Sequence, residues 1–278
     1  MTARATKSRS RAGRIGGVSG SIVKCICPRG VKTGYDWSVM AALEVEIWRG
    51  EGNDGSWRCY AVPHQANQTV LDVVTHVQRH IDPSLAYRFA CRVGMCGSCA
   101  MTVNGRPRWT CRTHVSRVSR KGRLRISPLR NLPVIRDLAV DMAPFFEKWR
   151  DAEARFVPSP VPVEEPVRPG EPARKAADAG IECINCAICY AACDSVAWNP
   201  DYPGPAALNR LWTLVNDRRD GDQDGHLEAA GTGCHLCRSH QECAEVCPTN
   251  LNPTTAIAGL KREVFRRTLA RPPWEGRQ

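Results

Sequence analysis

The stretch Cys183-Ile-Asn-Cys-Ala-Ile-Cys-Tyr-Ala-Ala-Cys193 places four cysteines in a C-x2-C-x2-C-x3-C run. This spacing holds iron–sulfur clusters, and where two clusters are present the fourth cysteine ligates the other one. The proline that usually follows is replaced by Asp194. A similar run begins at Cys237 and ends in Cys247-Pro248, with His240 in the place of a middle cysteine. The two runs together predict a pair of clusters.

Exchange of ligands between the two runs divides their cysteines into a set of four and a set of three. The set of four, which suits a 4Fe-4S cluster, is Cys183, Cys186, Cys189 and Cys247. The set of three, which suits a 3Fe-4S cluster, is Cys193, Cys237 and Cys243. Alternatively, His240 supplies a fourth ligand to the latter, since imidazole can bind iron. Cys234 could compete with Cys237, but only Cys237 has the expected spacing to Cys243.

A third group of cysteines lies nearer the N-terminus. Cys91, Cys96 and Cys99 follow a C-x4-C-x2-C spacing, with Cys111 as a distant fourth member. This is the plant-type spacing of a 2Fe-2S centre. The small residues of the loop, Gly94, Gly97 and Ser98, let backbone amides point at the sulfur atoms and help to set the reduction potential. Zinc is the alternative metal, but zinc sites usually show two C-x2-C pairs.

The composition agrees with metal ligation by reduced thiols. Fifteen cysteines is an odd number, so complete internal disulfide pairing is excluded, and we expect no signal peptide. Four cysteines fall outside the three sets: Cys25, Cys27, Cys59 and Cys234. We expect Cys59 to be a buried apolar residue of a strand. No run of eighteen apolar residues predicts a transmembrane helix.

The net charge of +11 at first suggests an anionic partner such as nucleic acid. Residues 1–40, however, contain eight Lys or Arg and one Asp, which leaves only +4 for the rest of the chain. A zinc-bearing nucleic-acid binder is therefore disfavoured, also because Arg and Lys are scattered in the cysteine-rich regions. We expect residues 1–40 to be a disordered basic extension, with a transit peptide or a true start at Met40 as alternatives.

Two domains are expected after this extension. Residues 41–152 form a β-rich 2Fe-2S domain, residues 153–173 a proline-rich linker, and residues 174–270 an α-helical domain with two clusters. Strands are predicted at Leu43–Trp48, Trp57–Val62, Ala100–Val103, Arg108–Cys111 and Leu124–Ile126, with Asn104-Gly105 as a hairpin turn. Helices are predicted at Thr69–His80, Asp137–Ala152, Pro205–Asp217, Gln223–Ala230 and Thr254–Leu269. The fold class is α+β: a β-grasp plant-type ferredoxin domain, then an all-α bacterial-ferredoxin-like domain.

Three clusters in this order resemble the iron–sulfur subunit of succinate dehydrogenase and fumarate reductase, the complex II family. The resemblance extends beyond the ligands, and its segments are Leu85–Arg92, Met95–Cys99, Arg136–Met142, Cys183–Cys193, Asn199–Ala207 and Cys247–Ile257. It implies that a partner flavoprotein with FAD interconverts succinate and fumarate, and that electrons pass through the three centres to a membrane quinone. This chain then has no catalytic residue of its own.

The resemblance also implies a location and a quinone site. The N-terminal domain would face the flavoprotein and the C-terminal domain a membrane anchor, at the cytoplasmic face of the cell membrane or the matrix side in a mitochondrion. The quinone would lie near Asp194, Ser195, Trp198 and Arg238, although Trp198 is alternatively a packing residue. Departures from the family pattern lie at Asp194, Ala197, Arg238 and Thr249. A different flavin-dependent dehydrogenase of a dicarboxylate or hydroxy acid is therefore an alternative partner.

Overall fold

A five-stranded mixed sheet, in the order β2-β1-β5-β3-β4, is the core of the N-terminal half. Its strands are β1 (Ala42–Glu51), β2 (Asp54–Pro63), β3 (Ala100–Val103), β4 (Arg106–Trp109) and β5 (Arg123–Ser127). In β1 the alternate residues Leu43, Val45 and Ile47 are buried, because successive side chains of a strand point to opposite faces. The computed structural model describes residues 42–161, 165–231 and 233–270, so the predicted extension 1–40 lies outside the described residues.

The hairpin between β3 and β4 turns at Asn104-Gly105, as predicted, with positive φ at both residues. The strand after the turn ends earlier than expected. Cys111 does not lie on it but in a single 3-10 turn, η3 (Thr110–Arg112). The turn forms because the backbone N–H and the hydroxyl of Thr110 both donate to the carbonyl of Cys99, at 3.2 and 2.8 Å. Cys59, expected to be buried, is only partly buried on β2.

The helix that the sequence predicts at Thr69–His80 packs against this sheet. It consists of α1 (Val70–His76) and a π-helical turn, η2 (Val77–Ile81). Its valines at helical spacing are buried in the core of the sheet: Val70, Val73, Val74 and Val77. A short helix, α2 (Val115–Val118), follows the hairpin.

The helix predicted over Asp137–Ala152 is wrong in its first part. Only α3 (Ala143–Asp151) is helical, and it is preceded by a small hairpin of β6 (Val134–Arg136) and β7 (Ala139–Val140). The reason is Asp137, which has a φ of +50° and a buried carboxylate that accepts the backbone N–H groups of Gly50 and Ala86 at 3.0 and 2.8 Å. A helical Asp137 would lose these contacts with β1 and with the loop that contains Ala86.

The second half is helical in its described residues. Its helices are α4 (Pro172–Ile181), α5 (Ile188–Ala192), α6 (Asp194–Trp198), α7 (Pro205–Val215), α8 (Gln223–Gly231), α9 (Glu242–Glu245) and α10 (Pro253–Ala270), with a 3-10 turn, η4, at Cys234–Leu236. The sequence predicted α7, α8 and α10, but it did not predict α4 or the short α5, α6 and α9. The central α7 buries Leu208, Leu211 and Leu214. None of the helices in the described part of the chain is long and apolar enough to cross a membrane.

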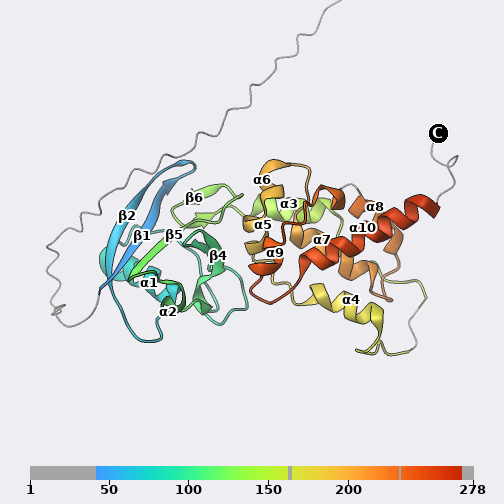
Figure 1. The fold of residues 1–278 in the computed structure, drawn as a ribbon, viewed down its shortest axis with the longest axis horizontal. Coiled ribbons are helices and arrows are strands. Elements are labelled where there is room, and N and C mark those ends of the chain that lie inside the picture. The colour runs from blue at the N-terminus through green and yellow to red at the C-terminus, as the bar shows by residue number, and fades with distance from the viewer. Residues whose placement is uncertain (1–41, 162–164, 232, 271–278) are drawn as a thin grey trace, which may run out of the picture.

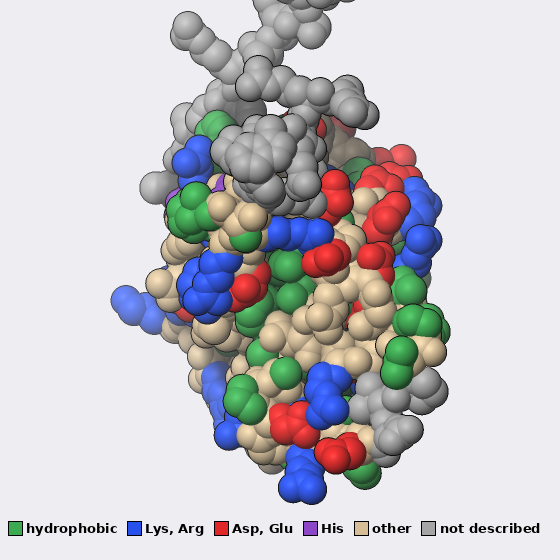
Figure 2. Space-filling view, turned by 90° about the vertical axis from the view of Figure 1, so that its right-hand side faces the viewer, with side chains coloured by type: hydrophobic (Ala, Val, Ile, Leu, Met, Phe, Trp, Pro, Cys, Tyr) green, Lys and Arg blue, Asp and Glu red, His purple; other side chains and the backbone are tan. Residues whose placement is uncertain are grey.

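The two halves share part of one core. Phe145 of α3 lies in the same buried cluster as Tyr190 and Leu208, so α3 packs among the helices of the second half (Figure 1). Figure 2 shows basic and acidic side chains interspersed on the described part of the end of the helical half. Ion pairs in the helical half include Arg267–Asp224 and Arg266–Glu263.

Candidate metal centres

The loop that begins at Cys91 gathers backbone N–H groups around one sulfur. Cys91 Sγ accepts hydrogen bonds from the N–H groups of Val93, Met95 and Cys96 at 3.4, 3.3 and 3.4 Å. The loop can wrap in this way because Gly94 has a φ of +78°, a conformation that favours glycine. The three hydrogen bonds lower the pKa of Cys91 to about 6, so the loop stabilises a thiolate, the form that binds metal.

The other two cysteines of this group lie on the inner side. Cys99 and Cys111 are buried together with Leu71, and Trp109 packs against them. Burial and the neighbouring Cys99 raise the pKa of Cys111 to about 12. The group therefore has one pair near solvent, Cys91 and Cys96, and one pair shielded from it. Buried thiols of this kind become thiolates when a metal supplies the compensating positive charge.

The four cysteines predicted to share one cluster line a single cavity in the helical half. They are Cys183, Cys186, Cys189 and Cys247. Burial raises the pKa of Cys186 to about 12 and that of Cys189 well above its ordinary value. Asn209 also lines the cavity, and its side-chain oxygen has no hydrogen-bond partner among the described residues. Four partly buried thiols around one space fit a cluster that is held by four cysteines.

The three cysteines predicted to hold the 3Fe-4S cluster have a common neighbour. The charges of Cys193, Cys237 and Cys243 each contribute to the raised pKa of the buried Tyr202 phenol. Burial raises the pKa of the Cys193 thiol, and it raises that of Cys243 to about 11. The Cys243 sulfur lies 3.4 Å from the Thr254 hydroxyl. Sequence reasoning gave no role to Tyr202, although a tyrosine close after a ligand was a possible signal.

Two family models match the chain in the order of these groups. A 2Fe-2S iron-sulfur cluster binding domain matches residues 44–147, and a 4Fe-4S dicluster domain matches residues 182–252. A fumarate reductase iron-sulfur subunit of Mycobacterium tuberculosis is 35% identical over 244 residues, which are 84% of this chain and 97% of that protein. The chain belongs to the iron–sulfur subunits of succinate dehydrogenase and fumarate reductase.

Other relatives of this iron–sulfur subunit agree. A succinate dehydrogenase iron-sulfur subunit of Paracoccus denitrificans is 34% identical over 201 residues, covering 71% of this chain and 77% of that one. A chain from the solved Mycobacterium smegmatis Sdh1 complex in the apo form matches with a TM-score of 0.75 at 27% identity. That match covers 84% of this chain and 99% of the other. The predicted family is confirmed, and so are ferredoxin-type domains in the predicted order.

The first and second cysteine groups of the subunit touch each other. Gly97 packs so tightly on Cys186 that a Cβ added at Gly97 would lie 2.6 Å from the Cys186 Cβ. Asn131, from the first half, donates its side-chain N–H to the carbonyls of Tyr190 and Cys193 at 2.9 and 3.0 Å. These contacts join the halves next to the metal-binding residues. Sequence reasoning missed both of them, because nothing in the local spacing links residues so far apart.

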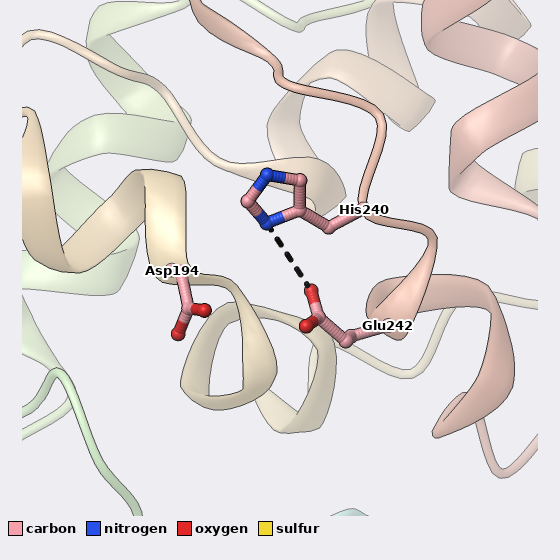
Figure 3. A group of neighbouring side chains, drawn as sticks. All are labelled: Asp194, His240 and Glu242. Atoms are coloured by element: carbon pink, nitrogen blue, oxygen red, sulfur yellow. Dashed lines mark ion pairs between the residues drawn. The ribbon is translucent and has the colours of Figure 1, made fainter.

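The possible extra ligand His240 lies among carboxylates. Its Nδ1 is 4.0 Å from a carboxylate oxygen of Glu242, and the other ring nitrogen points away from Glu242 (Figure 3). Possible ligand atoms of Asp194, His240 and Glu242 all lie within 4.8 Å of one another. The imidazole is half exposed, so it belongs to the surface beside the third group. Whether it ligates iron stays a prediction.

The residues predicted near a quinone follow two cysteines of the third group in the chain. Asp194, Ser195 and Trp198 lie on α6, which begins directly after Cys193, and Arg238 follows Cys237 and is exposed. Ser195 is buried, whereas the Trp198 side chain is 82% exposed. Trp198 is therefore not a packing residue within the described part of this chain. An exposed indole at this point is available to a ligand or to a partner subunit.

Proposed function

We propose that this subunit conducts single electrons between a FAD flavoprotein that interconverts succinate and fumarate and a membrane quinone. The observation that carries the proposal is the arrangement of the three cysteine groups: the loop of the first meets a cysteine of the second at Gly97 and Cys186. The second and third groups share the helical half. The names of the relatives, which are succinate dehydrogenase and fumarate reductase subunits, favour this partner over another flavin-dependent dehydrogenase.

Each cysteine group has a proposed cofactor. Cys91, Cys96, Cys99 and Cys111 hold a 2Fe-2S cluster; Cys183, Cys186, Cys189 and Cys247 hold a 4Fe-4S cluster; Cys193, Cys237 and Cys243 hold a 3Fe-4S cluster. When bound, these clusters accept and release one electron at a time. The surrounding folds are proposed to be a β-grasp domain and an all-α domain.

Hydrogen bonds and burial within this chain determine how strongly negative charge is stabilised at each cysteine group. The N–H groups of Val93, Met95 and Cys96 stabilise charge on the Cys91 sulfur, and such hydrogen bonds raise a reduction potential. Cys99 is buried, and desolvation raises the pKa of the partly buried Cys189 well above its ordinary value. Differences in burial and in hydrogen bonding between the groups would separate their potentials.

Exposed apolar residues support the proposed partner surfaces. Val93 and Met95 are exposed beside Cys91, on the side proposed to face the flavoprotein. Trp198 is exposed beside the third group, on the side proposed to face the membrane anchor and the quinone, near Ser195 and Arg238. The subunit would then be held peripherally at the cytoplasmic or matrix face of the membrane by its partners.

Electron paramagnetic resonance of the anaerobically purified complex tests this function. We expect a 3Fe-4S signal in the oxidised sample and a 2Fe-2S signal after reduction by succinate. A sample that contains zinc and no iron contradicts the proposal. If dithionite reduced the clusters and succinate did not, the cluster assignments would stand and the proposed substrate would be rejected.

A further inference from the structure

Tyr202 is a fully buried tyrosine whose hydroxyl has no hydrogen-bond partner among the described residues. It lies between α6 and α7 and packs in the core of the helical half. Lys148 of α3 fixes its backbone by donating to the Tyr202 carbonyl at 2.8 Å. A buried phenol nearly always has a hydrogen-bond partner, so an unpartnered one in a rigid place indicates that a group outside the described residues accepts its hydrogen bond.

Two thiols of the third group, those of Cys193 and Cys237, pack against the same buried cluster as Tyr202. Burial raises the pKa of Tyr202, and the charges of Cys237, Cys193 and Cys243 raise it further. These three cysteines are the proposed ligands of the third cluster. A phenol has an ordinary pKa of about 10 and is protonated at physiological pH, so the Tyr202 hydroxyl is available as a donor.

We propose that Tyr202 is a positioning residue whose hydroxyl donates a hydrogen bond to a sulfur atom at the third cluster and raises its reduction potential. The inference rests on the proposed function, because it requires a cluster on Cys193, Cys237 and Cys243. Sulfur atoms bound to iron carry negative charge and accept hydrogen bonds. One-electron reduction adds one negative charge to the site, while the phenol proton stays on Tyr202. The hydrogen bond is consequently stronger in the reduced state.

Tyr202→Phe in the complete, cluster-loaded complex tests the inference, because phenylalanine fills the same space and removes only the hydroxyl. A redox titration followed by electron paramagnetic resonance should give a lower midpoint for the 3Fe-4S signal. The midpoints of the 2Fe-2S and 4Fe-4S signals should not change. Tyr60→Phe is the control: Tyr60 is a buried tyrosine of the sheet half whose hydroxyl is bonded to Arg49 and Asp82. It should leave the 3Fe-4S midpoint unchanged.

A second measurement observes the hydrogen bond itself. Wild-type and Tyr202→Phe complexes produced and purified in D2O are compared by electron-nuclear double resonance, and one deuteron coupling to the third cluster should be present in the wild type and absent from the variant, whereas couplings from the N–H of Ser239 on Cys237 should remain in both. An unchanged midpoint in Tyr202→Phe, or deuteron couplings that are identical in the two complexes, overturns the inference and leaves the proposed function intact. A wild-type complex without any 3Fe-4S signal overturns both.

Discussion

Cys234 and Cys237 are three residues apart, but their surroundings differ. Cys234 is completely buried in the apolar core of the helical half, at the start of η4. Cys237 is only partly buried, its sulfur accepts the N–H of Ser239 at 3.4 Å, and Lys261 holds its carbonyl at 2.8 Å. The Cys237 backbone is thus fixed from α10. These differences support Cys237 as the ligand and Cys234 as a packing residue.

Alanine variants separate the two roles. We expect Cys237→Ala to abolish the 3Fe-4S signal, because two cysteines cannot hold the cluster. Cys234→Ala should retain the signal and lower the free energy of unfolding by about 1–2 kcal/mol, since it leaves a small cavity. The two measurements are the resonance spectrum of the oxidised complex and a denaturant titration. The reverse pattern, with the signal lost only in Cys234→Ala, would exchange the assignments.

At the scale of elements, α1 connects the sheet with the first cysteine loop. Thr69 and Asp72 form a capping box at its N-terminus, with the Asp72 carboxylate accepting the Thr69 N–H at 3.0 Å. Asp72 also pairs with Arg92, which lies next to Cys91. Burial alone would raise the pKa of Asp72, but the hydrogen bonds from Thr69 and the charge of Arg92 outweigh it and lower the pKa. The helix start thus anchors the loop.

Asp72→Ala should lower the free energy of unfolding by about 1 kcal/mol, because it removes the half of the capping box in which the Asp72 carboxylate accepts the Thr69 N–H. Because the folded-state pKa of Asp72 is depressed, its stabilising effect is complete well above the unfolded pKa of about 3.9 and declines as the pH falls through that value. The deficit should therefore be equal at pH 8 and pH 6 and smaller at pH 4, in denaturant titrations followed by circular dichroism.

Asp178→Ala is the matched control for this experiment. Asp178 also pairs with an arginine, Arg174, but on the exposed surface of α4 and without a capping role. Exposed pairs four residues apart contribute only about 0.3–0.5 kcal/mol, so this variant should remain close to wild type. Equal losses in the two variants would mean that the ion pair, and not the cap, carries the effect.

Elements were predictable from the sequence where a local pattern determines them. The valines of α1 and the alternation in β1 are such patterns, and both predictions are confirmed. The predicted start of α3 was wrong because the non-helical conformation of Asp137 is fixed by distant partners, the N–H groups of Gly50 and Ala86. The short α5 was missed because it begins after Ala187, whose φ of +58° is not typical of alanine. Local propensity gives no sign of such long-range effects.

The same distinction holds for the whole molecule. Spacing along the chain predicts which cysteines belong together, because the ligands of one run lie within a few residues of each other. It does not predict how the halves meet. Arg106 donates to the Glu245 carbonyl at 2.6 Å, and Gly97 contacts Cys186, although nearly ninety residues or more separate the partners in each pair. These contacts set the distance between the first two cysteine groups, so they are part of the proposed electron path.

Gly97→Ala tests this junction. Alanine at a φ of +69° is strained, and its Cβ would lie 2.6 Å from the Cys186 Cβ, so the halves must move apart. Gly105→Ala is the matched control, because Gly105 has a φ of +80° but nothing within 4 Å of an added Cβ. Backbone strain alone should lower the free energy of unfolding of both variants by about 1–2 kcal/mol. Gly97→Ala should lose more than Gly105→Ala, because its Cβ also clashes with Cys186.

The rate of electron transfer in Gly97→Ala shows whether the contact between the halves carries electrons or whether the substitution only strains the loop. In complex mixed with succinate and rapidly frozen, the 2Fe-2S signal of Gly97→Ala should develop at the wild-type rate, since the flavoprotein side is unchanged. Loss of the oxidised 3Fe-4S signal should be delayed, because the electron must cross the widened contact between Gly97 and Cys186. Gly105→Ala should show no delay. If Gly97→Ala reduced both centres at wild-type rates, the contact would serve only to pack the two halves together.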